Sequence, residues 1–500
     1  MKNKLAILFS LFLSATYVAL GQSHNYWTRS FNEESSLLSG SVVGGGAGPS
    51  AIYYNPASIS EVKASKLSLN TSLFSLNFIN IHNALGDHID LGEAIGRVEP
   101  RFIAYMLKLK KYQTWSFEIA FLNNENVETE FLAAVDAREN VLTGNPGDDR
   151  YVAYYQYYNK FKDEWIGIGA SKKFGNRLFL GMSMFATIKT LKYQHSLDIQ
   201  AYPLSDTMLV SDAGNSFHAA GYEELNYLSF TDYRLMWKFG IIYKWNYLSI
   251  GLMVTTPSVG VYSDRKSVQH KEQQSNITNP QTGLQMADYL ITDFDTKRDV
   301  KVSFKTPFSV AAGLTYNFRD GRRIIFLSME YFSGIDPYRM VEAEENPLLT
   351  AGTGGEKYSD WLTYVTGAKP VFNVALGYSW TLTEKLMLKA GLRTDFNYQK
   401  NLDFGQFAEN VKIRKTNLDL YHFTCGLSWV IFGQDIITGV EYSFGRTANQ
   451  TQFVNLSDPV EYNFMEHKAL QGTRINNMTS TYNAIILYLG LSLNFGDKKK

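Results

Sequence analysis

Residues 44–58, GGGAGPSAIYYNPAS, place four glycines just before two tyrosines and an Asn-Pro-Ala triplet. Glycine-rich loops can hold phosphate groups, because their backbone N–H groups can approach a ligand closely. A phosphate-binding loop of that kind is followed by a helix and a Lys-Ser or Lys-Thr pair, and neither pattern occurs here. Pro56 removes a backbone donor and keeps Asn55 out of helical geometry. We therefore interpret the stretch as a compact, irregular segment that docks on another part of the protein.

Charged residues inside alternating apolar segments are the second group that could do chemistry. Cations in a partly dry interior could hold the carboxylate of a ligand, and four occupy such positions: Arg234, Lys238, Lys389 and Arg393. Acidic residues in comparable positions could pair with them across neighbouring strands: Glu118, Glu330, Asp395 and Glu441. Ligand contacts and internal ion pairs are both open interpretations for each cation.

The histidines and the cysteine give no sign of an enzyme. No histidine stands in a recognisable Ser/His or metal-ligand spacing, and we interpret His422 as a polar residue of an interior surface. Cys425 is the single cysteine, which excludes an internal disulfide and a Cys-rich metal site, and its parity in the strand turns it outward. We expect no catalytic residue, no metal and no cofactor.

Charge and hydropathy limit the partners and the membrane topology. Lys and Arg together number 48, as do Asp and Glu, so nothing favours nucleic acid as a partner. Residues 1–21 combine Lys2 and Lys4 with an apolar run that ends at Gly21, the pattern of a cleaved secretory signal peptide. After it, no apolar run approaches the roughly 18 residues that a membrane-spanning helix needs.

Several segments alternate between apolar and small or polar residues with a period of two. In residues 484–495, AIILYLGLSLNF, one parity is wholly apolar, and the other includes Ala484, Gly490 and Ser492. Residues 307–318 and 371–380 follow the same rule. Strands with one apolar face and one small, polar face are typical of a transmembrane β-barrel.

Fourteen such strands can be placed after residue 65. Their joins alternate between short turns and long polar segments of roughly 20 to 50 residues, the pattern of an outer-membrane barrel whose short turns are periplasmic. The strands are expected at 66–78, 100–110, 114–122, 164–174, 178–192, 231–244, 247–257, 307–318, 322–332, 371–381, 385–397, 418–431, 435–445 and 482–495.

The predicted fold is therefore all-β: a 14-stranded antiparallel transmembrane β-barrel over residues 66–495. Residues 22–65 lack a strand long enough to join the wall, and we expect them to fill the lumen as a hatch; 496–500 form a short periplasmic tail. Aromatic residues beside short turns would form a periplasmic girdle, and Trp165, beside a long join, would lie in an outer girdle. The periplasmic set is Trp115, Phe318, Trp380 and Trp429.

The N-terminal segment resembles the hatch of the FadL/TodX (OMPP1) family of outer-membrane transporters of hydrophobic compounds. The resemblance runs over the whole mature chain, since that family also has fourteen strands and an N-terminal hatch. It implies that the hatch gates the channel and that its Asn-Pro-Ala packs against a kink in the third strand, where the wall opens sideways. The third strand here, TWSFEIAFLNN, has no glycine or proline to mark a kink. The matching hatch residues are Gly44, Gly45, Gly46, Gly48, Asn55, Pro56 and Ala57.

The resemblance implies a channel for passive uptake of long-chain fatty acids or other hydrophobic small molecules, in a monomeric barrel of a Gram-negative outer membrane. Its candidate lumenal contacts are Arg234, Lys238, Lys389 and Arg393. FadL-like barrels also include structural or docking components of protein-secretion or surface-attachment systems, which is the alternative. The tyrosine-rich residues 148–165 could be an apolar entry site at the barrel mouth or an extension of the fourth strand above the membrane.

Overall fold

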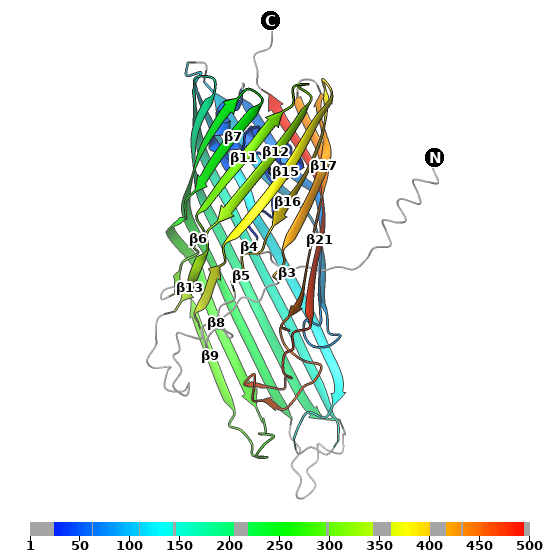
Figure 1. The fold of residues 1–500 in the computed structure, drawn as a ribbon. Helices are drawn as coiled ribbons and strands as arrows, with labels where there is room; N and C mark the ends of the chain where they lie inside the picture. The colour runs from blue at the N-terminus through cyan, green and yellow to red at the C-terminus, as the bar shows by residue number, and fades with distance from the viewer. Residues whose placement is uncertain are drawn as a thin grey trace, which may run out of the picture.

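The computed structural model describes residues 25–62, 64–109, 111–143, 147–204, 219–296, 300–343, 362–400, 417–431 and 434–494. The expected signal peptide and the expected tail lie outside these ranges. Within them, no helix has the length and hydropathy needed to cross a membrane. Strands dominate this part of the chain (Figure 1).

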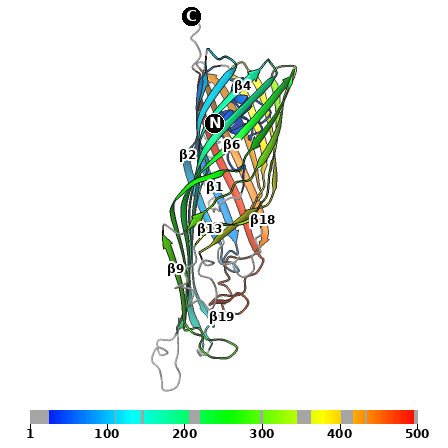
Figure 2. The ribbon, with the colours of Figure 1, turned by 90° about the vertical axis from the view of Figure 1, so that its left-hand side faces the viewer.

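Fourteen antiparallel strands close into one barrel, which confirms the predicted fold class (Figures 1 and 2). The first and last of them pair with each other, and the β5–β6 pairing completes the ring. The wall strands are β1 (Lys66–His82), β2 (Leu91–Lys108), β3 (Trp115–Glu139), β4 (Asp149–Phe174), β5 (Leu178–Pro203), β6 (Ala220–Trp245), β7 (Leu248–Thr255), β11 (Ser309–Asn317), β12 (Arg323–Phe332), β15 (Val371–Thr383), β16 (Leu386–Asp395), β17 (Leu420–Ile431), β18 (Gln434–Gln450) and β21 (Met478–Asn494).

Side chains alternate between the two faces of the wall as predicted. Phe423 on β17 and Leu487 on β21 are exposed on the outer face, whereas Thr424 and Tyr488 are buried inside. Cys425 is exposed on the outer face. The outer face is thus the apolar one, as lipid contact requires. The end of the barrel with the short joins is the periplasmic rim, by the rule that short turns face the periplasm.

The strands β3, β4, β5 and β6 extend further outward than predicted, to 25 residues in β3 and 26 in each of the others. On β4 the apolar face changes side near Trp165. Nearer the periplasm, Ile166 and Ile168 are exposed outside; further out, Tyr151 and Tyr155 are buried inside. Beyond the membrane the outer face meets water, so the polarity of the two faces reverses. The tyrosine-rich segment is therefore a strand extension, and an apolar entry site at the barrel mouth stays a prediction.

Further strands and loops complete the outer end of the barrel. The outer half of β6 pairs with β8, which pairs with β9, so the wall continues beyond β7. The additional strands are β8 (Val259–Ser275), β9 (Tyr289–Thr296), β10 (Lys301–Val302), β13 (Ile335–Glu342), β14 (Tyr364–Ala368), β19 (Tyr462–Asn463) and β20 (Lys468–Ala469). The loops pack inside this outer wall and form its largest buried apolar cluster with it.

Residues 25–62 lie inside the barrel: residues 31–62 fill it near the periplasmic rim (Figure 1), and residues 25–30 lie further outward, beside Asp395 at the outer end of β16. We call residues 31–61 the hatch and residues 25–30 the strap. The hatch contains four short helices: α2 (Glu33–Leu37), η1 (Gly48–Ser50), α3 (Ala51–Tyr54) and η2 (Pro56–Glu61). Such short helices have little stability of their own, so the hatch depends on the surrounding wall for its conformation.

Candidate functional site

The glycines of the hatch form a turn that lies directly on the wall. Gly45 and Gly46 have φ angles of 123° and 81°, and Gly48 has a φ of 55°, values that other residues rarely adopt. A Cβ on Gly44 would lie 2.7 Å from the carbonyl carbon of Leu314 on β11. The turn is fixed by Glu61, whose carboxylate accepts the N–H of Gly46 at 2.8 Å. These glycines therefore serve close packing of backbone against backbone.

Asn55 fastens the Asn-Pro-Ala triplet to the hatch and to the wall. Its side-chain oxygen accepts the N–H of Ala57 at 3.1 Å and so caps η2, which begins with Pro56. Its amide nitrogen donates to the carbonyl of Val43 at 2.9 Å. Longer bonds from the same nitrogen reach two wall carbonyls, those of Ile241 and Leu252.

A band of glycines on the inner wall receives the hatch backbone. Gly240 and Gly251 face Asn55, and Gly313 faces Gly44; a Cβ at any of them would lie within 3.0 Å of hatch atoms. The band extends over nine strands: Gly169, Gly181, Gly240, Gly251, Gly313, Gly377, Gly391, Gly426 and Gly439. Because the space of the missing side chains is taken by hatch atoms, backbone at Gly181, Gly313 and Gly391 and side chain at Gly169 and Gly439, the hatch and the wall are complementary at atomic distances.

The position of the Asn-Pro-Ala triplet differs from the one implied by the resemblance. The triplet lies against Gly181 on β5, Gly240 on β6 and Gly251 on β7, and not against the third strand. The hatch reaches β3 instead through Ile52, whose N–H lies 3.3 Å from the carboxylate of Glu118. Glycines on β5, β6 and β7 leave room for this turn, since a Cβ at Gly181, Gly240 or Gly251 would lie within 3.0 Å of hatch atoms.

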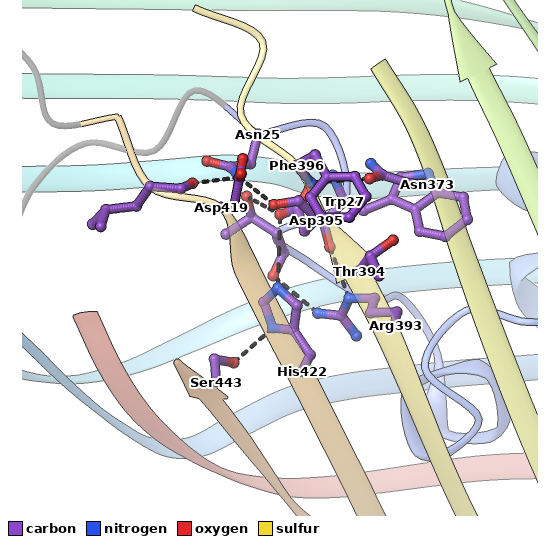
Figure 3. A network of polar contacts seen from close by, with 12 residues as sticks. Asn25, Trp27, Asn373, Arg393, Thr394, Asp395, Phe396, Asp419, His422 and Ser443 are labelled. Atoms are coloured by element: carbon purple, nitrogen blue, oxygen red, sulfur yellow. Dashed lines mark hydrogen bonds and ion pairs between the residues drawn. The ribbon is translucent and has the colours of Figure 1, made fainter. Parts of the chain in front are cut away.

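The strap is attached to β16 by charged groups (Figure 3). The carboxylate of Asp395 accepts the N–H of Trp27 at 2.8 Å and the hydroxyl of Thr28 at 3.1 Å. Arg393 donates to the carbonyl of Trp27 at 2.9 Å and to the hydroxyl of Ser30 at 2.8 Å. Polar contacts to the wall thus hold the strap, whereas close apolar and backbone packing holds the hatch.

Arg393 belongs to a buried ion network and not to a ligand site. Its guanidinium lies 2.7 Å from the carboxylate of Glu441, and His422 contacts the same carboxylate at 2.9 Å. His422 also lies 2.6 Å from the hydroxyl of Ser443 (Figure 3). Similarly, Arg234 pairs with Asp232 at 2.8 Å. For these two arginines the structure favours the internal pairing that the sequence had left open.

A cavity of about 420 Å³ lies in the described part of the lumen. Hatch and strap form part of its lining through Tyr53, Tyr26 and Thr28, and outer loops close it from the other side through Phe304 and Tyr338. Tyr26 stacks between Phe332 and Tyr398, each ring centroid 4.3 Å away. Volume and aromatic lining are those of a site for a small, mostly apolar ligand.

Of the four cations that the sequence suggested as ligand contacts, Lys238 lines this cavity and has no described ion-pair partner. Its side chain is 4% exposed, and its ammonium lies 4.1 Å from the ring centroid of Tyr53. No described acidic side chain lies within ion-pair distance of it, whereas the neighbouring Lys189 is paired with Asp163 at 2.6 Å. Lys389 is also buried on the inner face but does not line the cavity.

Trp165 is a cavity residue, which corrects the prediction that it lies in an outer girdle. It is 8% exposed, and its ring packs against Tyr53 at 5.6 Å and Phe185 at 5.3 Å. Its indole N–H donates to Asp163 at 2.8 Å. Odd-numbered residues of β4 point inward, and Trp165 is one of them. The prediction rested only on its position beside a long join.

β2 and β3 separate partway along the wall. Their ladder ends at Phe102 and Leu122, although both strands continue outward with other partners. The register between β3 and β4 shifts between Asn123 and Glu125 at the same level. A bulge of this kind bends a strand without glycine or proline. We call the resulting gap between β2 and β3 the seam.

Side chains bridge the seam in place of ladder hydrogen bonds. Arg97 of β2 donates to the carbonyls of Asn126 at 3.2 Å and Glu128 at 2.8 Å on β3. Glu99 of β2 accepts from the side chain of Asn126 at 2.7 Å. Arg29 of the strap pairs with Glu99 at 2.8 Å, so the strap takes part in closing the seam.

A second cavity of about 80 Å³ lies beside the seam and is lined by Arg97, Asn126, Thr28 and Arg29, among others. Thr28 lines the larger cavity as well. The strap therefore borders both cavities through Thr28.

His270 in the outer wall belongs to a buried polar cluster. His270 on β8 lies 2.7 Å from the side-chain oxygen of Asn226, and burial lowers its pKa despite the nearby carboxylates of Glu224 and Glu272. Lys468 pairs with Glu272 at 2.9 Å and links a loop hairpin to this cluster. Among the residues that the structure describes, no group of His, Cys, Asp and Glu is placed to hold a metal ion.

Comparison with solved structures identifies the architecture. A FadL homologue of Pseudomonas aeruginosa aligns over 96% of this chain and all of its own, with a TM-score of 0.54 and 12% identity. The fold is that of the FadL and TodX channels. The toluene transporter TodX of P. putida aligns over 97% of this chain and all of its own (TM-score 0.52, 12% identity). The toluene transporter TbuX of Ralstonia pickettii aligns over 93% and 99% (TM-score 0.51, 11% identity). No family model and no curated protein matches the sequence.

Proposed function

We propose that the protein is a passive channel for hydrophobic small molecules, monomeric in the outer membrane of a Gram-negative bacterium after cleavage of its signal peptide. The observation that carries the proposal is the cavity of about 420 Å³ above the hatch, which is lined in part by aromatic residues. A purely structural barrel needs no such space, because loops and side chains could fill the lumen. The FadL-like fold and the transport functions named for TodX and TbuX agree with this proposal.

The proposed ligand class is amphipathic, with a long-chain fatty acid as the leading candidate. The aromatic lining would contact the hydrocarbon chain, and Lys238 would hold the carboxylate with a charge-assisted hydrogen bond. Lys238 suits this role because its ammonium is buried beside Tyr53 without a described acidic partner. Arg234 and Arg393 are excluded from it by their ion pairs with Asp232 and Glu441.

The proposed route leads from the cavity past the strap to the seam. The hatch is seated on backbone contacts with the wall glycines, so movement of the whole hatch would break many close contacts at once. Movement of the strap breaks fewer contacts: its polar contacts with Arg393, Asp395, Glu330 and Glu99 and the stacking of Tyr26. We propose that this movement joins the two cavities, because Thr28 of the strap lines both. The bridges of Arg97 and Glu99 then remain as the last barrier before the lipid.

The test is uptake of a labelled long-chain fatty acid and of toluene by cells that express matched surface levels of each variant. Lys238→Met removes the charge, and a charge-assisted hydrogen bond is worth about 1.5 to 3 kcal/mol, so fatty-acid uptake should fall roughly tenfold or more. Toluene uptake should not change. Lys192→Met, on the exposed outer face of β5, is the matched control and should change neither.

The alternative is a structural or docking component of a secretion or surface-attachment system. It predicts no uptake of any hydrophobe above an empty-vector control, and loss of function when the outer loops are trimmed. The transport proposal predicts instead that Asn55→Ala with Pro56→Ala leaves an assembled barrel with altered uptake, since these residues hold the hatch and not the wall.

A further inference from the structure

One arc of the periplasmic rim is strongly basic. It comprises four consecutive joins, those of β2–β3, β4–β5, β6–β7 and β11–β12, which are neighbours because β3 pairs with β4, β5 with β6 and β7 with β11. The described cations of this arc include Lys111, Lys172, Lys173, Arg177, Arg319 and Arg322. Asp320 is the acidic residue in these joins. The whole chain has equal numbers of acidic and basic residues, so the excess is local.

Internal ion pairs neutralise only part of the arc. Lys244 pairs with Glu61 of the hatch at 2.5 Å, and Arg323 pairs with Asp320 at 2.6 Å. None of the described acidic side chains forms an ion pair with Lys111, Lys172 or Arg177. Several positive charges therefore remain available to an external anion.

Aromatic rings place these cations at the border of the apolar band. Lys172 points to the outer face, with its ammonium 5.2 Å from the ring centroid of Trp115 and 5.0 Å from that of Phe174. On the next joins Trp245 is 61% exposed and Tyr247 is 46% exposed. Exposed Trp and Tyr are typical of the headgroup level of a membrane, and a lysine over such rings lies at the same level.

We propose that this arc, represented by Lys111, Lys172, Arg177 and Arg322, binds the phosphate headgroups of anionic phospholipids in the leaflet around the periplasmic rim. Charge complementarity requires an anion, and an acidic protein would also supply one. The lipid is favoured because Lys172, Trp115 and Phe174 lie on the outer face of the wall, where the next residues outward, such as Ile168, contact the bilayer. The proposal goes beyond the transport function and does not depend on it.

The experiment compares two variants that lose the same charges at opposite ends of the barrel. The first carries Lys111→Gln, Lys172→Gln, Arg177→Gln and Arg322→Gln. The matched control carries Lys162→Gln, Lys192→Gln, Arg138→Gln and Arg339→Gln, outside the apolar band at the outer end. Each full-length protein is incubated in mixed micelles with equal amounts of phosphatidylglycerol and phosphatidylethanolamine of the same acyl chains. Native mass spectrometry then counts the bound lipids of each class.

Wild-type protein and the control should retain phosphatidylglycerol in preference to phosphatidylethanolamine, and the preference should weaken in high salt. In the arc variant the preference should fall about fivefold for each removed charge that contacts a headgroup. Heat-modifiable migration in SDS verifies that each variant is a folded barrel. Absence of a preference in the wild type, or an equal loss in both variants, would overturn the proposal. Either result would leave the uptake experiment unaffected, so the two proposals fail separately.

Discussion

Replacing Gly240 with alanine tests whether the hatch is held by its fit to the wall. The new Cβ would point into the lumen from β6, 2.9 Å from Cδ of Pro56, 3.0 Å from the nitrogen of Ala57 and closer still to the side-chain oxygen of Asn55. Ordinary contacts at these atoms need about 3.4 Å or more, and the wall backbone is fixed by its ladders to β5 and β7. The hatch must therefore move.

The expected cost is about 1 to 3 kcal/mol, the usual range for inserting a methyl group into a packed interior. The displacement also strains the hydrogen bonds that Asn55 makes with Val43 and Ala57. The barrel itself should assemble normally, because every ladder bond of β6 remains. We expect an unseated hatch inside an intact barrel.

Planar-bilayer conductance and swelling of proteoliposomes in a small sugar measure the result, since an unseated hatch opens a polar path. Gly221→Ala is the control on the same strand: its Cβ would meet only the hydroxyl of Ser275 at 3.2 Å and a carbonyl at 3.9 Å, far from the hatch. Gly240→Ala should increase the permeability and Gly221→Ala should not. Equal, low permeability in both variants would refute the idea that wall glycines seat the hatch.

Three further predictions concern the wall and its outer end. Met182→Arg places a charge on the lipid face of β5 and should destabilise the assembled barrel by about 2 to 4 kcal/mol. Gln194→Arg, on the same face of β5 but beyond the apolar band, should not. Heat-modifiable migration after urea titration measures the difference. Glu461→Ala should loosen the outer loops, because its carboxylate accepts the N–H of Thr278 at 2.6 Å from another loop, and trypsin cleavage of intact cells should reveal the change. The lowered pKa of His270 means that the folded outer wall favours the neutral imidazole. The stability of the outer wall should therefore be highest above about pH 6.5 and should fall as the pH drops below that value. Hydrogen exchange at pH 7.5 and pH 5 measures this loss, and His270→Gln should weaken its dependence on pH.

The wall of the barrel was predictable from the sequence because the bilayer imposes the same rule on every strand that crosses it. Residues such as Phe423 and Leu487 must face lipid, and their neighbours must face the lumen. The rule stops at the membrane surface. Beyond Trp165 on β4 the apolar face turns inward toward the loops, so the pattern of outward apolar residues predicts strands that are too short.

The site was less predictable, because its contacts join residues that are far apart in the chain. Lys238, Arg234 and Arg393 look equivalent in sequence, and only the folded lumen shows that Glu441 pairs with Arg393 while Lys238 faces the cavity. The seam is of the same kind. It lies where β3 shifts register at Asn123–Glu125 and where β2 shifts register beside Pro100, which has no backbone N–H to donate.

The band of wall glycines has a consequence for how the barrel reaches its correct register. A strand that slipped by two residues would keep its inward and outward faces and would regain a ladder with its neighbours, so neither lipid nor hydrogen bonding distinguishes it strongly from the native strand. The slip would, however, bring Lys238 or Ile242 to the level of Gly240, and Lys389 or Arg393 to the level of Gly391, where only hatch backbone fits. The hatch thus fits one register of the wall: it precedes every strand in the sequence, and a wall that closed out of register could not seat it.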